Sequence, residues 1–259
     1  MIVKIIEKIG HYFIANISKI GDAFNFAGNS VFHCLTPPFY PRLFFRQIMQ
    51  IGYYSLPVVG LTAIFSGAVL ALQSYSGFSR FNAESTIATV VVLSITRELG
   101  PVLAGLMVAG RVGASMAAEI GTMKVTEQID ALRTLSTNPF KYLFAPRILA
   151  GIIMMPFLVL IADIIGVMGG YLVSVHSLGF SSGPYIANTF KYLESIDVIS
   201  GLVKAGFFGF IISVVGCYFG YNSNRGAEGG GIATTNAGVT SSILILLTNY
   251  IITCWLFGN

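Results

Sequence analysis

An arginine and a glutamate lie side by side in a stretch that is otherwise apolar enough to cross a membrane. Arg97 and Glu98 follow twelve uncharged residues, 85–96, and precede twelve more, 99–110. A charge at the centre of a bilayer costs at least about 3 kcal/mol on insertion scales. Charged residues inside membranes pair with one another or mark a polar path, so this pair is the first candidate for a binding site.

Pro101 places a helix irregularity at the same point. Proline has no N–H, and in a regular helix the carbonyl that it leaves unpaired is that of residue 97. Freed backbone at membrane depth is tolerated only beside protein or a water-filled cavity. Two interpretations stay open: a cavity that accepts a polar or anionic headgroup, and a buried charge network that only holds helices together.

The composition places these residues in an integral membrane protein. The chain has 259 residues, of which 54% are hydrophobic and 10% charged, and its mean hydropathy is +0.77. Soluble domains carry about 25% charged residues. A membrane-spanning helix needs about 20 mostly apolar residues, and five segments qualify: 48–73, 85–110, 148–175, 198–221 and 236–257. We therefore predict an all-α membrane protein with a transmembrane domain over 47–259.

Lysine and arginine are distributed unevenly between the two sides of these spans. Eleven lie in segments 1–46, 111–147 and 222–235, whereas two lie in 74–84 and 176–197. Because cytoplasmic loops carry the excess of basic residues, the N-terminus and loop 111–147 should be cytoplasmic and the C-terminus periplasmic. The net charge of +4 therefore reflects membrane topology and gives no reason to expect a nucleic-acid partner.

Two further segments are predicted to be amphipathic helices. In the N-terminal segment 1–46, isoleucines and Phe13 recur at three- and four-residue spacing from Ile2 to Ile20, which indicates an interfacial helix on the membrane surface or a cytosolic helix packed on a partner. Within loop 111–147, Val125, Ile129 and Leu132 form an apolar stripe. This helix is either a docking element for another protein or a solvated connector.

Asp163 and Lys204 are the remaining charges within the spans. At a rise of 1.5 Å per residue, both lie in the outer half of a bilayer core about 30 Å thick. We therefore predict that they form a structural ion pair.

Several chemical functions lack their usual sequence signals. No GxxxxGK[ST] phosphate-binding loop occurs, and the three histidines are scattered, so we predict no catalytic residues, no metal and no cofactor in this chain. Cys34, Cys217 and Cys254 are predicted to be apolar fillers. The glycine-rich stretch 226–238 is predicted to be a flexible hinge. Uphill transport would need energy from a partner or an ion gradient.

The stretch RELGPVLAGLMVAGRVGASMAAEIGTMKVTEQIDAL, residues 97–132, resembles the signature block of MlaE-type (YrbE-type) permeases. These are the membrane subunits of lipid-transporting ABC systems that work with mammalian-cell-entry (MCE) proteins. SGAVLALQ at 66–73, NPFKYLFAPR at 138–147, Thr234-Thr235 and the terminal FGN also fit the family pattern. The resemblance covers nearly the whole chain.

The resemblance implies a non-catalytic homodimer in the bacterial inner membrane. It implies two copies of a cytoplasmic ATPase that binds ATP and magnesium, periplasmic MCE proteins, and phospholipid traffic that maintains outer-membrane asymmetry. The lipid cavity would involve Arg97, Glu98, Pro101, Gln73 and Phe81, the last standing where a tyrosine would supply a hydroxyl. The ATPase-coupling residues would be Glu119, Lys124, Thr126, Glu127, Gln128, Asp130, Leu132 and Arg133. The alternative is an ion-coupled secondary transporter with Glu98, Asp163 or Lys204 as a proton relay.

Overall fold

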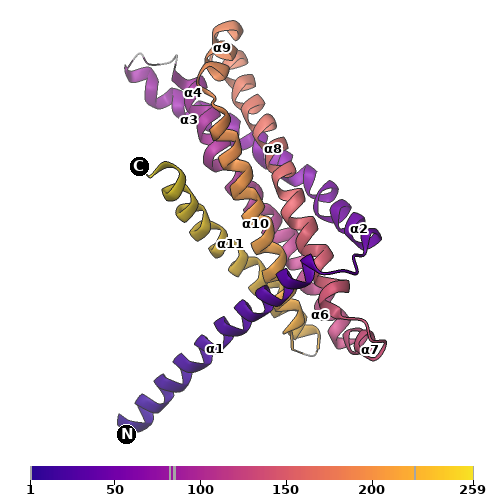
Figure 1. Cartoon of the computed structure of the whole chain (residues 1–259). Coiled ribbons are helices and arrows are strands. Elements are labelled where there is room, and N and C mark those ends of the chain that lie inside the picture. Colours follow the sequence, from indigo (N-terminus) through magenta and orange to yellow (C-terminus); the bar gives the residue numbers. More distant parts are fainter. Residues whose placement is uncertain (1, 82, 84–85, 225, 259) are drawn as a thin grey trace.

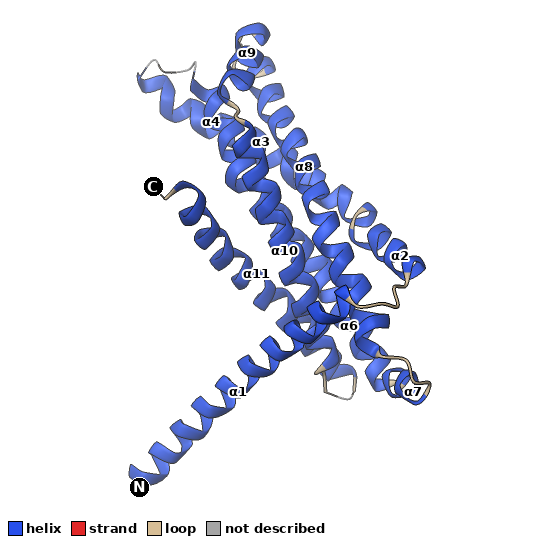
Figure 2. Cartoon of the chain, in the orientation of Figure 1, coloured by secondary structure: helices blue, strands red, loops and turns tan. Residues whose placement is uncertain are grey.

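The computed structural model describes residues 2–81, 83, 86–224 and 226–258; the side chains of residues 2–13, 15, 16, 19, 81 and 227 lie outside this description. Every regular element in the described residues is a helix, and most helices form one elongated bundle (Figures 1 and 2). The α-helices are α1 (Ile2–Leu35), α2 (Pro41–Ile51), α3 (Leu56–Phe78), α4 (Ile87–Ser94), α5 (Gly100–Val108), α6 (Ala114–Val125), α7 (Gln128–Thr134), α8 (Ala145–His176), α9 (Ser182–Tyr192), α10 (Ser195–Tyr221) and α11 (Ala227–Phe257). The predicted all-α class is confirmed.

Shorter helical turns join several of these helices. Two are 3₁₀ turns, η1 (Tyr53–Ser55) and η2 (Ser79–Phe81). Three are single π-helical turns, η4 (Ile95–Leu99), η5 (Ala109–Gly113) and η6 (Phe140–Phe144). Single π turns inside α-helices occur often at functional sites, and η4 contains the Arg97–Glu98 pair.

Five helical stretches are long and apolar enough to cross a membrane, as predicted. They are Pro41–Phe78, Ile87–Val125, Phe140–His176, Ser195–Tyr221 and Glu228–Phe257. The predicted boundaries need correction in the middle of the chain. The second helix continues to Val125 instead of ending at 110, so most of the predicted loop 111–147 is helical.

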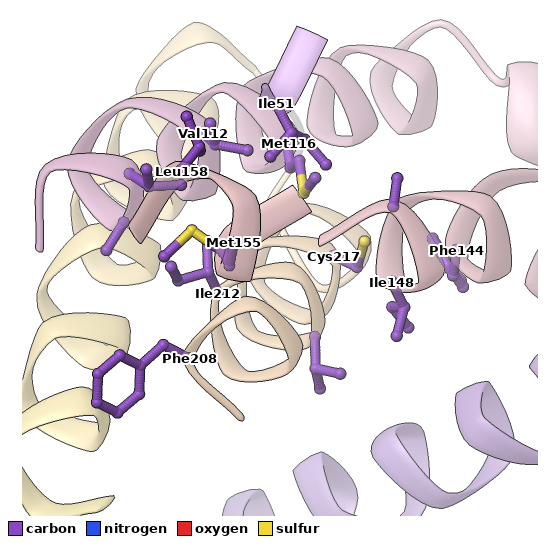
Figure 3. Packing of buried hydrophobic residues seen from close by; sticks show 14 of the residues in the cluster. Ile51, Val112, Met116, Phe144, Ile148, Met155, Leu158, Phe208, Ile212 and Cys217 are labelled. Atoms are coloured by element: carbon purple, nitrogen blue, oxygen red, sulfur yellow. The ribbon is translucent and has the colours of Figure 1, made fainter. Parts of the chain in front are cut away.

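The bundle is held together by close helix packing, which the small-residue spacings favour. A Cβ added to Gly67 of α3 would lie 1.9 Å from the carbonyl oxygen of Gly166 in α8. Likewise, a Cβ on Gly209 of α10 would lie 2.2 Å from the carbonyl oxygen of Gly151. Bulky buried side chains form the hydrophobic core between the helices, among them Met155, Phe208 and Ile212 (Figure 3). Glycine at the crossings therefore lets the backbones touch.

Helix α1 leaves the bundle at the end opposite α9, and its N-terminus lies far from the other helices (Figure 1). Its C-terminal part is anchored by Phe26, whose ring centroid lies 5.0 Å from that of Phe144. Farther out, Ile14, Ile17 and Ile20 are exposed. The predicted helix is confirmed, whereas its position on a membrane surface stays a prediction.

Two other predictions about local structure were wrong. The stretch 226–238 is no hinge, because α11 begins at Ala227 and buries Ala233 and Ala237. Tertiary packing here outweighs the low helix propensity of glycine. Cys34 and Cys217 are buried fillers as predicted, but Cys254 is exposed. Burial raises the pKa of the Cys34 thiol to about 11, which disfavours its reactive thiolate.

Candidate functional site

The π turn η4 reorganises the backbone around the charged pair. The amide of Gly100 donates to the carbonyl of Ile95, five residues earlier, and Pro101 has no amide hydrogen to donate. The carbonyl of Arg97 instead accepts a hydrogen bond from Lys204 Nζ of α10 at 2.8 Å. A lysine from another helix therefore satisfies the carbonyl that the proline leaves unpaired.

Glu98 is the centre of a polar cluster contributed by three helical segments. Its Oε1 lies 2.7 Å from Lys204 Nζ and accepts a hydrogen bond from Thr253 Oγ1 at 2.9 Å. Its Oε2 accepts a hydrogen bond from Asn249 Nδ2 at 2.8 Å. The Lys204 side chain is fully buried, so its ammonium depends on the Glu98 carboxylate and the Arg97 carbonyl for charge compensation.

Arg97 makes a second ion pair on the neighbouring face of the turn. Its Nη2 and Nε lie 2.6 and 2.7 Å from Oδ1 of Asp197, a fully buried residue at the start of α10. The other carboxylate oxygen of Asp197 accepts the amide hydrogen of Glu194 at 3.1 Å in a capping box. The Arg97 guanidinium also lies 4.7 Å from the centre of the Phe257 ring, within the range of a cation–π contact. We call Arg97, Glu98, Asp197, Lys204, Asn249 and Thr253 the charge cluster.

The charge cluster has the contacts of a helix-joining network, and the cavity interpretation stays a prediction. Its buried half fastens the second membrane helix to α10 and α11. Its outer half remains open, because 36% of the Arg97 side chain and 37% of the Glu98 side chain are exposed. A guanidinium and a carboxylate thus stand side by side at membrane depth with part of their surfaces exposed.

The other residues expected at the cavity are placed differently. Pro101 is buried, and its Cγ would lie 3.3 Å from a Cβ on Gly201, so it packs against α10. Gln73 is exposed on α3 and, among the described residues, makes no hydrogen bond to the charge cluster. The side chain of Phe81 lies outside the described residues.

The predicted ion pair between Asp163 and Lys204 is wrong. Lys204 pairs with Glu98, whereas neither carboxylate oxygen of the buried Asp163 has a hydrogen-bond partner in the described part of the chain. Asp163 instead packs against Gly100, where an added Cβ would lie 1.9 Å from its Oδ1. The two residues have similar heights in their helices but project toward different neighbours.

Arg111, in the second π turn, makes contacts that the sequence analysis did not anticipate. Its Nη2 donates to the carbonyl of Gln50 at 2.6 Å and to Oγ of Ser55 at 2.7 Å. Its Nε donates to the same hydroxyl at 3.1 Å. These bonds close the break between α2 and α3, where the 3₁₀ turn η1 interrupts the first membrane helix.

The short amphipathic helix predicted within 111–147 is present as α7, directly after a turn at Thr126 and Glu127, whereas its coupling role stays a prediction. Ile129 is buried and Leu132 half-buried, so these two residues anchor α7, while Val125 of the predicted stripe is exposed. Four of the predicted coupling residues form an exposed outer face. They are Glu127, Gln128, Asp130 and Arg133.

The remaining contacts of this region tie it to the ends of the membrane helices. Arg133 donates to the Tyr221 hydroxyl and lies 3.4 Å from Asp130. Lys124 Nζ donates to the carbonyl of Ser223 at 3.0 Å. The Thr126 hydroxyl donates to the Thr122 carbonyl within the turn.

Glu119 lies in α6 and pairs with Arg147 at 2.8 Å. Arg147 is buried and also donates to the carbonyl of Leu143. The ion pair therefore joins α6, at the end of the second membrane helix, to the start of α8, a contact that charge counting along the chain could not anticipate.

Sequence reasoning missed three members of the charge cluster. Asp197 was counted with a loop, although the spacing Glu194-x-x-Asp197 resembles a capping box at a helix start. Asn249 and Thr253 stand four residues apart in an apolar span, so they share one helix face. That spacing was the available signal for a polar contact.

Comparisons with known proteins agree on one family. The family described as Permease MlaE matches residues 44–255. A probable ABC transporter permease protein of Rickettsia felis is 64% identical over 98% of each chain. The intermembrane phospholipid transport system permease protein MlaE of Haemophilus influenzae is 36% identical over 83% of each chain.

A plant protein extends this likeness beyond bacteria. Protein TRIGALACTOSYLDIACYLGLYCEROL 1, chloroplastic, of Arabidopsis thaliana is 35% identical over 89% of this chain and 66% of its own length. The family match covers far more than half of the present sequence, including every residue of the charge cluster. The chain therefore belongs to the MlaE permease family.

Proposed function

We propose that this chain is the non-catalytic membrane subunit of an ABC-type transporter that moves phospholipids between the inner and outer membranes and maintains outer-membrane lipid asymmetry. The observation that carries the proposal is the half-open Arg97–Glu98 pair at membrane depth. A guanidinium can bind a phosphate, and a carboxylate can accept hydrogen bonds from an amine or hydroxyl headgroup. The name of the Haemophilus relative supports a phospholipid as the substrate.

The proposal includes a homodimer in the bacterial inner membrane, with the N-terminus cytoplasmic and the C-terminus periplasmic. Helix α11 supports a second copy because it exposes large apolar side chains, including Val239, Ile243, Tyr250 and Trp255. A groove of about 450 Å³ runs along the same helix beside Gly110 and Ala114. Since Asn249 and Thr253 of α11 hold Glu98, a second copy against this helix would lie next to the charge cluster.

Energy would come from a separate ATPase that binds ATP and magnesium and docks on the exposed face of α7. Short amphipathic helices serve as docking elements when one face is anchored and the other is free. The Ile129 and Leu132 anchors and the exposed Gln128 and Asp130 fit that description. MCE proteins would bind on the periplasmic side.

The test is purification of the tagged chain from its native membrane in mild detergent, followed by mass spectrometry of proteins and lipids. We expect a Walker-type ATPase, an MCE-domain protein and bound phospholipid. Charge reversal by Arg133→Glu should reduce lipid-stimulated ATP hydrolysis, while the matched exposed change Lys191→Glu on α9 should leave it unchanged. Recovery of the chain without an ATPase in several detergents would contradict the proposal.

One observation favours the alternative of an ion-coupled transporter. Asp163 is a buried carboxyl without a hydrogen-bond partner among the described residues, as a proton-carrying group could be. That function predicts lipid movement in vesicles that hold this chain alone, abolished by an uncoupler. Transport that needs ATP and survives the uncoupler would exclude it.

A further inference from the structure

A cavity distinct from the charge cluster lies at the elbow between the N-terminal helix and the membrane bundle. It has a volume of about 240 Å³ and opens between α1, the link 36–40, α2, η6 and the start of α8. Its lining consists of aromatic, aliphatic and proline side chains together with one lysine and one histidine. The lining residues are His33, Pro38, Phe39, Tyr40, Pro41, Phe44, Lys141, Ala145, Pro146, Leu149 and Ile153.

Contacts between the surrounding segments fix the walls of this elbow cavity. The rings of Tyr40 and Tyr142 meet edge to face at 5.2 Å, and Lys141 Nζ donates to the carbonyl of Pro37 at 2.5 Å. The His33 ring bonds the carbonyl of Asn29 through Nδ1 at 2.7 Å and the amide nitrogen of Asn138 through Nε2 at 3.0 Å. Because the Asn138 amide is a donor, His33 is assigned as the neutral tautomer with its proton on Nδ1. Lys141 therefore supplies the positive charge of the lining.

The elbow cavity lies where the first and third membrane helices begin, at Pro41 and Phe140. Its apolar side continues into exposed side chains, including Phe39 and Ile153. Arg42 directly follows a lining residue and is also exposed, and the described lining residues include no acidic side chain. The cavity thus combines an apolar lining with Lys141, and the exposed Arg42 lies next to the lining residue Pro41 in the chain.

We propose that the elbow cavity binds an anionic phospholipid from the leaflet at this basic end of the bundle. An acyl chain lies against Phe44, Leu149 and Ile153, and the headgroup phosphate lies by Lys141 and Arg42. The Lys141 ammonium has three N–H groups, of which one donates to Pro37, so two remain for phosphate oxygens. Basic pockets between membrane helices bind anionic headgroups in this way.

This site is separate from the charge cluster and does not rest on the proposed transport function. The two sites share no residue, and the elbow cavity is formed within one copy of the chain. Its ligand belongs to the surrounding bilayer, so binding can be measured without ATP, ATPase or transport. A failed binding test would leave the transport proposal intact, and failed transport would leave this site intact.

The test uses tryptophan fluorescence in bilayers. The full chain carries a single tryptophan, Trp255, which a Trp255→Phe background removes. Phe39→Trp then places a reporter in the lining, and Phe45→Trp places a control on α2 outside it; the two phenylalanines are similarly exposed, at 60% and 65%. Each variant is reconstituted in phosphatidylcholine with increasing brominated phosphatidylglycerol or brominated phosphatidylcholine.

We expect the reporter at 39 to show an affinity for phosphatidylglycerol at least about fivefold above that for phosphatidylcholine, because each of the two basic residues should contribute up to about that factor. The control at 45 should show nearly equal affinities. Equal affinities at both positions, or no quenching at 39, would overturn the proposal.

Charge substitutions then test the residues assigned to the headgroup. Lys141→Gln with Arg42→Gln should remove the preference at position 39, and Lys141→Arg should retain it. Arg42→Gln alone should lower the preference for phosphatidylglycerol. This single variant keeps the contact between Lys141 and Pro37, so it still tests the headgroup assignment if the double variant does not fold. A preference that survives every neutral substitution in folded protein would contradict the headgroup assignment.

Discussion

Arg97 and Arg111 lie on the same membrane helix, each inside a π turn, but their partners differ in kind. Arg111 donates to the carbonyl of Gln50 and the hydroxyl of Ser55, which are neutral groups at a break in the adjacent helix. Arg97 pairs with the carboxylate of Asp197 and stands beside Glu98, which in turn pairs with Lys204. One turn is thus closed by neutral acceptors and the other by two ion pairs.

The difference separates a structural arginine from a candidate ligand-binding arginine. Backbone carbonyls freed by a helix break need donors, and Arg111 supplies them without a charged partner. The charge cluster uses more charges than a helix break requires, and two of them stay partly exposed. Ionised groups at membrane depth are expensive, so this excess is the reason that we propose a charged or polar ligand here.

The largest effect is expected from Lys204→Met. The substitution leaves Glu98 without its buried cation and the Arg97 carbonyl without its donor. Removing one member of a buried ion pair costs about 3 kcal/mol, the low end of the usual range because Glu98 is partly exposed. Thermal unfolding of the purified protein in detergent measures the loss.

The double variant Lys204→Met with Glu98→Gln serves as the control, because it removes both charges together. It should recover part of the lost stability, since no uncompensated carboxylate remains. Losses that simply add in the double variant would show that Glu98 and Lys204 are not coupled, which contradicts the assigned ion pair.

The variants Arg97→Gln and Arg111→Gln should distinguish the roles of the two π turns in stability and in transport. Arg111→Gln is expected to lower stability by about 2 kcal/mol, because hydrogen bonds from a charged donor to buried acceptors are lost. Lipid transport per folded complex should stay unchanged. Arg97→Gln should lower transport about tenfold if a single charged contact to the headgroup is lost.

The comparison requires that stability and transport be measured on the same preparations. Recovery of the assembled complex and its unfolding temperature report on structure, and the rate of lipid transfer between vesicles reports on function. If Arg97→Gln prevented assembly while Arg111→Gln did not, the charge cluster would be a structural element, which contradicts the ligand-binding role proposed for Arg97.

The sequence predicts those features of the fold that depend only on neighbouring residues along the chain. Apolar runs of about 20 residues gave the number of membrane helices, and the missing amide of Pro101 located the irregularity at Arg97. The hinge prediction for the glycine-rich start of α11 was wrong, because the helical state of this stretch depends on packing against α6 and α10. Ala233 and Ala237 are buried there. Propensity alone does not contain that information.

Only part of the candidate site could be predicted from the sequence. Arg97 and Glu98 stood out as charges between apolar runs, but their partners come from helices about 100 or more residues away. Helix rise gives the height of a residue in the membrane and not the neighbour that it faces. The similar heights of Asp163 and Lys204 in the membrane therefore predicted an ion pair, although Asp163 packs against Gly100 and Lys204 pairs with Glu98.

Smaller effects are expected from single hydroxyl groups in the two turns. Ser55→Ala removes the buried acceptor of Arg111 and should cost about 1 kcal/mol, the contribution of an ordinary hydrogen bond. Thr253→Val removes one of three donors to Glu98 and should cost less, because Lys204 and Asn249 remain. Chemical unfolding of both variants in the same detergent gives the comparison, and a larger loss for Thr253→Val would contradict the assigned order.

Asp163→Asn should have the smallest effect on stability, below about 0.5 kcal/mol, the lower end of what one hydrogen bond contributes. The carboxylate has no hydrogen-bond partner among the described residues, and the amide keeps its shape over Gly100. Unchanged ATP-dependent transport in this variant would also remove Asp163 as a proton relay. If Asp163→Asn caused a large loss of stability that an added Lys204→Met substitution relieved, the ion pair between Asp163 and Lys204 would be supported after all. Lys204 would then have to pair with both Asp163 and Glu98.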